Sequence, residues 1–302
     1  MRKINLQLFG DAQPVAARSY AKDFKELLQA VFENQSYFAD FFGGSIEALD
    51  GIQNKDVAFS VKTSDIPVVI GTYSTDANTA MGTGTGSSSR FGNRTEIIYA
   101  DTDVRYTWEW NFHEGIDRHT VNNDLDAAVA DRLELQARAK TTKFNQQHSA
   151  FISASAAKSI AAGTLSEASV LKAFKDLAIY FAEIGSVGTK KAKVSPEVYN
   201  YLVDSANATS SKGSSVSMDE NGLMKYKGFV IEEVPSAVLQ KNECIYAYVE
   251  AVGKAFTGIE TARTIESEDF DGVALQGCGK AGEYILPANK PAVAKVTYTP
   301  AA

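Results

Sequence analysis

The sequence has little of the chemistry that holds metals, cofactors or disulfides. Its 302 residues include two cysteines and three histidines. The cysteines, Cys244 and Cys278, lie far apart and have no further Cys or His at zinc-binding spacing, so we expect both to be reduced. This pattern argues against a disulfide framework, and we expect no metal and no cofactor.

Long apolar runs are also missing. None approaches the roughly 20 residues that a membrane-spanning helix needs, and the apolar stretch in residues 4–10 is too short for a signal peptide. We therefore expect no membrane partner, and a chain that stays in the cytoplasm where it is made.

A basic excess is absent too. The formal net charge is −7, which argues against a protein whose main task is to grip nucleic acid. Residues 1–25 are an exception, because they hold five basic and two acidic residues. A basic arm on an acidic body is typical of an interaction tail, although an ordinary solvated terminus has the same composition.

Three local patterns are similar to enzyme motifs, and each lacks an essential residue. The glycine run 82–86 has no Lys-Ser or Lys-Thr to hold a phosphate and magnesium. His113 and Glu114 open a zinc-protease pattern, but Asp117 stands where the second His is needed. The serine-rich stretch 213–215 does not form a nucleophile elbow. We assign no catalytic residue, and a soluble α+β enzyme with an unrecognised site stays as an alternative.

Several segments have the apolar spacing of an amphipathic helix. Residues 124–162 contain no Gly or Pro, and thirty of them would span about 45 Å; Asn122 or Asn123 can cap this helix. A later helix is predicted to start with a capping box of Thr164 and Glu167 and to end at Gly185. Residues 19–42 form the first predicted helix, with a stop at 43–44. Its apolar stripe consists of Phe24, Leu27, Leu28, Val31 and Phe32.

Alternating apolar residues predict strands. Residues 57–61 alternate, and a stronger alternation from Val104 to Phe112 predicts one strand with a buried aromatic face that includes Trp108 and Trp110. Between these strands, residues 78–89 are too small and polar to fold around a core, so we interpret them as the mobile tip of a protruding hairpin. Further short strands are predicted at 191–194, 229–231, 245–249, 273–275, 284–286 and 293–298. The predicted fold class is α+β.

The order of these elements resembles the major capsid protein of tailed bacteriophages, the Hong Kong 97 fold, over nearly the whole chain. Residues 5–10 resemble the start of capsid proteins from phages of Gram-positive bacteria. Residues 194–199 are similar to the strand-to-helix step of that family, and residues 222–235 to a later turn and strand. Two departures are Phe229, where the family often has Pro, and Gln276, where a basic residue is frequent.

The resemblance implies a division of the chain. Residues 1–35 would be the N-terminal arm and first helix, 36–61 the start of the peripheral domain, 62–100 the extended hairpin loop, 101–161 the peripheral domain with the spine helix, 162–262 the axial domain, and 263–302 the return to the peripheral domain.

The function that the resemblance implies is self-assembly into an icosahedral head shell that encloses phage DNA. It implies pentamers and hexamers of this chain, a separate scaffolding protein, a portal protein, non-specific contact with packaged double-stranded DNA, and location in the virion after assembly in the host cytoplasm. A bacterial nanocompartment shell of the same fold is the main alternative. Lys62, at the base of the hairpin, is poorly placed for a covalent crosslink of the kind that some relatives form. The expected intersubunit contact residues are Leu6, Leu8, Phe9, Gly82, Gly84, Gly86 and Arg90.

Overall fold

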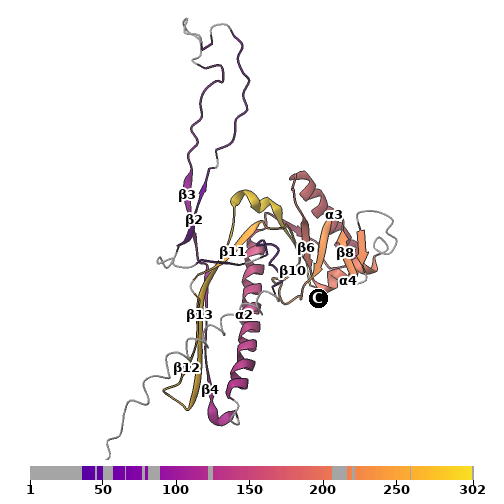
Figure 1. Ribbon diagram of the computed structural model, residues 1–302. Coiled ribbons are helices and arrows are strands. Elements are labelled where there is room, and N and C mark those ends of the chain that lie inside the picture. The colour runs from indigo at the N-terminus through magenta and orange to yellow at the C-terminus, as the bar shows by residue number, and fades with distance from the viewer. Residues whose placement is uncertain are drawn as a thin grey trace, which may run out of the picture. The chain divides into compact units, whose positions relative to one another are not determined.

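The computed structural model describes residues 36–300 except 45, 50–56, 65, 77–78, 81–88, 122–124, 206–215, 220–221 and 259. The chain divides into two compact units, residues 52–105 and the remainder, which we describe one at a time. Strands and helices are both abundant in the larger unit, as the α+β prediction requires (Figure 1).

A seven-stranded mixed sheet forms one half of the larger unit. Its strand order is β5 (Lys158–Ala161), β14 (Val293–Thr297), β10 (Glu243–Val249), β6 (Lys190–Val194), β9 (Phe229–Glu233), β8 (Gly222–Tyr226) and β7 (Val216–Asp219). Helices α3 (Glu167–Glu183) and α4 (Pro196–Asp204) lie beside this sheet (Figure 1). Their apolar faces and the sheet bury one core cluster, which includes Phe174, Leu177, Phe181, Leu202 and Phe229.

A second sheet is organised around one long strand, β13 (Gly272–Ile285). One edge of β13 pairs with β4 (Trp108–Asp117), and the other pairs with β12 (Thr261–Glu266) and then with β11 (Gly253–Thr257), which in turn pairs with β1 (Glu47–Ala48). Short 3-10 helices follow β4 (Arg118–Thr120) and precede β14 (Pro287–Ala292).

Helix α2 (Leu125–Ser155) has 31 residues and lies alongside β4 and β13 (Figure 1). Val129, Leu133 and Ala137 pack against Val273 and Leu275 of β13. The long helix predicted from the absence of Gly and Pro is present, while its predicted caps, Asn122 and Asn123, lie outside the described residues.

The smaller unit contains one antiparallel pair, β2 (Val57–Thr63) and β3 (Ala100–Arg105). Lys62 pairs with Asp101 in its register, and their charged groups lie 3.7 Å apart at the surface. The described residues between these strands form no helix or strand.

Three sequence predictions were wrong in detail. The alternation from Val104 to Phe112 is not one strand: it breaks at 106–107, because β3 pairs with β2 and β4 pairs with β13. Helix α3 is capped two residues later than predicted, by a box of Ser166 and Ser169. The described end of the first predicted helix, residues 36–44, consists of turns and bends, with hydrogen bonds such as Phe41 N to the Phe38 carbonyl.

Candidate functional site

Large apolar side chains are exposed along both connecting segments of the smaller unit. Ile70 is 93% exposed and Phe91 is 84% exposed. The full set is Ile66, Val68, Val69, Ile70, Tyr73, Phe91, Ile97, Ile98 and Tyr99. Soluble monomers rarely expose a large contiguous apolar surface, and such a surface marks a site of protein–protein contact.

Several contacts between described residues join these two segments. The rings of Tyr73 and Phe91 meet edge to face with 5.1 Å between their centroids. The amide of Ser74 donates to the Arg90 carbonyl at 2.9 Å, and Arg90 Nε donates to the Thr79 carbonyl at 3.3 Å. Arg90, one of the predicted contact residues, therefore holds the loop of its own chain.

The other predicted contact residues cannot be placed. Leu6, Leu8 and Phe9, and likewise Gly82, Gly84 and Gly86, lie outside the described residues. Sequence reasoning also passed over the most exposed apolar side chains. The signal for them was present, because Val68-Val69-Ile70 and Ile97-Ile98-Tyr99 are consecutive apolar triplets, and adjacent residues of an extended chain point to opposite faces.

The aromatic face of β4, which was predicted to be buried, is half-buried. Its rings lie over glycines of β13: a Cβ atom added to Gly279 would lie 2.8 Å from the Trp110 indole, and one added to Gly277 would clash with the Phe112 ring. These two rings stack with centroids 5.7 Å apart. A groove of about 590 Å³ lies between β4 and α2.

A buried acid–base pair lies where β4 begins. Glu283 accepts hydrogen bonds from Trp108 Nε1 at 3.0 Å and Thr107 Oγ1 at 3.1 Å. His148 Nε2 on α2 lies 3.6 Å from the same carboxylate, and both side chains are almost fully buried. Burial lowers the pKa of His148 to about 3 and raises the pKa of Glu283. The imidazole is therefore neutral at physiological pH.

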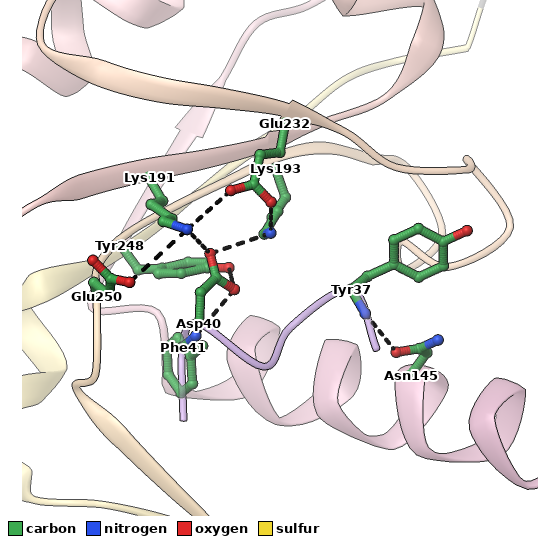
Figure 2. A network of polar contacts seen from close by, with 9 residues as sticks. All are labelled: Tyr37, Asp40, Phe41, Asn145, Lys191, Lys193, Glu232, Tyr248 and Glu250. Atoms are coloured by element: carbon green, nitrogen blue, oxygen red, sulfur yellow. Dashed lines mark hydrogen bonds and ion pairs between the residues drawn. The ribbon is translucent and has the colours of Figure 1, made fainter. Parts of the chain in front are cut away.

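A second polar cluster ties residues 36–44 to the seven-stranded sheet (Figure 2). Asp40 Oδ2 lies 3.2 Å from both Lys191 Nζ and Lys193 Nζ, and both lysines also contact Glu232. The Tyr248 hydroxyl donates to Asp40 Oδ1 at 3.0 Å. Burial opposes the charge of Lys191, but its contacts with Glu232 and Asp40 outweigh that effect and raise its pKa. The neighbouring side chains of Phe38, Phe41 and Phe42 are buried in the core.

Metal-binding geometry does not emerge from the described residues. They contain no group of three His, Cys, Asp or Glu side chains that could hold a metal ion. Within the same described ranges, no helix is long and apolar enough to span a bilayer. Cys244 is buried and Cys278 is exposed, and neither forms a disulfide. The most conspicuous functional feature is thus the exposed apolar surface.

Comparison with known proteins gives matches in structure alone. No protein-family model matches the sequence, and no curated protein sequence is significantly similar to it. The capsid structure of cyanophage P-SCSP1u is similar with a TM-score of 0.63 and 12% identity over 88% of this chain and 89% of that chain. The mature capsid of bacteriophage PhiM1 is similar with a TM-score of 0.61 and 13% identity over 88% of each chain.

A virus-like particle from Pyrococcus furiosus gives a TM-score of 0.53 and 13% identity, covering 92% of this chain and 99% of that chain. These likenesses span most of each chain. The chain therefore has the α+β fold of tailed-phage capsid proteins, the Hong Kong 97 fold.

Proposed function

We propose that this chain is the structural subunit of an icosahedral phage head, assembling with copies of itself around genomic DNA. One observation carries the proposal: residues 66–73 and 91–99 expose nine large apolar side chains. Burying them against neighbouring subunits would supply roughly 25 cal/mol per Å² of apolar surface. Because each subunit of a closed shell meets several neighbours, modest contacts add up.

The proposed division of labour follows the expected segments. The peripheral domain, 36–61, 101–161 and 263–302, would form the shell wall together with the axial domain, 162–262. The hairpin, 62–100, and the arm, 1–35, would reach adjacent subunits, with Leu6, Leu8 and Phe9 as apolar contacts of the arm. Pentamers and hexamers, a scaffolding protein, a portal protein and packaged DNA are the proposed partners, in a virion that is assembled in the host cytoplasm.

Lys62 supports a shell without covalent crosslinks. Its ammonium group already faces Asp101 across the β2–β3 pair at 3.7 Å. The lysine is thus already paired within its own chain, at the first residue of the proposed hairpin.

Electron microscopy of the purified chain, with and without a coexpressed scaffolding protein, tests the proposal. We expect closed shells or regular sheets and tubes built from the same subunit. A protein that stays monomeric at all concentrations under both conditions would contradict it. Shells from infected cells that contain folded protein cargo in place of DNA would favour a nanocompartment.

A further inference from the structure

The groove between α2 and β4 has an apolar floor and a charged rim. Trp110, Phe112, Leu135 and Phe144 contribute its apolar surface. On the rim, Arg132 forms an ion pair with Glu114, and Lys140 pairs with Glu260 at 2.8 Å while its ammonium lies 4.3 Å from the centroid of the Trp110 ring. The charges of Arg132 and Lys140 are therefore paired, and the apolar side chains of Leu135 and Trp110 stay partly exposed in the groove.

Leu135 shows how open this floor is. Its side chain is 50% exposed in the middle of a helix whose opposite face is buried against β13. The lining residues of α2 recur at 132, 135, 136, 139, 140 and 143, which is the spacing of one helix face. A second helix is the element that best fits along such a face.

The chain arrives in the described structure close to this groove. The amide of Tyr37 donates to Asn145 Oδ1 at 3.2 Å, and Asn145 follows Phe144, which lines the groove. Asn145 lies on the other flank of α2, so the preceding residues must cross the helix to reach the groove. The five extended steps from Phe32 to Tyr37 span about 17 Å, which exceeds the diameter of a helix, about 10 Å. Phe32 can therefore reach the end of the groove that Phe144 lines.

The sequence before Tyr37 has the matching apolar pattern. Phe24, Leu27, Leu28, Val31 and Phe32 have the spacing of one helical stripe. From Phe24 to Phe32 a helix would advance about 12 Å, and the lined face of α2 from Arg132 to Phe144 is about 18 Å long. The length of this segment and its point of attachment both fit the groove.

We propose that residues 19–32 form an amphipathic helix that packs its apolar stripe into the α2–β4 groove of the same chain, with residues 33–36 as an extended linker. The docked helix covers Leu135 and Trp110. It also sets the point from which residues 1–18 leave the subunit. The docking is a property of the single subunit, so it holds or fails independently of shell assembly.

A thiol probe in the groove tests the docking in the full-length chain. Cys278→Ser removes the exposed native thiol, Cys244 is buried, and Leu135→Cys places one reactive thiol in the groove. We expect maleimide to label the Leu135→Cys thiol about ten-fold or more slowly than it labels the same thiol in a chain whose helix cannot dock. The docked helix would cover the thiol, so the reaction must wait for local opening. Adding Leu27→Asp and Leu28→Asp should remove the protection.

Two matched controls isolate the effect. Gln29→Asp with Ala30→Asp adds the same two charges to the opposite face of the predicted helix and should leave the protection intact. Ala130→Cys, exposed on α2 outside the groove, should be labelled at one rate in all backgrounds. Circular dichroism of each variant checks that the subunit is folded.

Dilution distinguishes docking within one chain from docking of a second copy in the groove. Protection that is unchanged over a hundred-fold dilution of monomeric protein supports docking within one chain. Equal labelling of the Leu135→Cys thiol in the parent and in the Leu27→Asp, Leu28→Asp background overturns the proposal. So does protection that appears only in assembled particles, since a second copy would then fill the groove.

Discussion

Asp40 and Lys193 form a buried ion pair in which the carboxylate lies 3.2 Å from an ammonium group whose side chain is only 3% exposed. Asp40 belongs to the segment that joins the N-terminal residues to the body, and Lys193 belongs to β6 in the middle of the seven-stranded sheet. Their contact attaches that segment to the sheet.

We expect Asp40→Asn to lower the free energy of unfolding by about 3 kcal/mol, because removal of one partner leaves a buried charge poorly compensated. Asparagine keeps the shape of the side chain and can still accept from Tyr248. Urea denaturation measures the loss. Asp101→Asn, in the exposed pair with Lys62, should cost less than about 1 kcal/mol. Equal effects of the two substitutions would contradict the buried role of Asp40.

His148 should make the subunit sensitive to acid. Its pKa is about 3 in the folded protein and 6.5 in a model peptide, so the unfolded state binds the extra proton as pH falls below 6.5. Stability from the neutral imidazole is complete above that pH. About 2 kcal/mol of it is lost by pH 5, at 1.36 kcal/mol per pH unit.

The variant His148→Gln should lose this pH dependence, although it also loses packing at every pH. Glu283 acts in the opposite direction, because its raised pKa favours the folded state as the carboxyl takes up a proton. Since Glu283 is present in both proteins, the difference between their stability curves at pH 5 to 8 reports His148. Parallel curves would show that the imidazole is not kept neutral by burial.

Trp108 should matter through its indole N–H as well as its ring. Trp108→Phe removes the donor to the buried Glu283 carboxylate, and we expect a loss of about 2 kcal/mol. A double-mutant cycle with Glu283→Gln tests the contact, because the two effects should not add. Additive losses in thermal or urea unfolding would mean that the hydrogen bond contributes little.

Gly277 should tolerate no side chain while Phe112 is present. A Cβ atom there would clash with the Phe112 ring, so Gly277→Ala should destabilise the subunit by about 1 to 3 kcal/mol. Replacing Phe112 with Leu in the same protein should recover part of the loss. Gly71→Ala, where nothing lies within 4 Å of an added Cβ, is the matched control and should be nearly neutral.

The hairpin surface should be needed for assembly and not for folding. Ile70→Asp changes a side chain that is 93% exposed, so the stability of the monomer should change by less than about 0.5 kcal/mol. Closed shells should fail to form, because a charge would have to be buried in the contact. Ile70→Leu should still assemble. Normal shells from Ile70→Asp, seen by sedimentation and electron microscopy, would exclude this residue from the interface.

Sequence patterns predicted the elements that are determined by residues close together in the chain. The 31 residues of α2 follow from a stretch without Gly or Pro. The cap of α3 was misplaced because two serine or threonine residues compete there. The amide of Thr299 donates to the Gly163 carbonyl, Thr164 lies at a bend, and Ser166 caps the helix.

Features that depend on distant segments could not be predicted from the sequence. Val104 and Trp108 continue one alternation, but their partners are Phe59 and Ala281, and no local pattern reveals that change. The Asp40 cluster joins a turn to strands some 150 to 210 residues later in the chain. The groove likewise needs α2 and β4 to be placed side by side before it exists.

Helix α2 and strand β13 stay in contact over a long distance. Leu133 packs with Leu275 at one place, and His148 meets Glu283 at another. The 15 helical residues between the first and second contact advance about 22 Å, and the eight strand residues about 26 Å. The helix and the strand thus cover nearly equal lengths and are in contact near both ends. Bending this pair requires the helix to slide on the strand, which tight packing resists. A load on this part of the subunit should therefore be carried along its length, and deformation should concentrate at its ends.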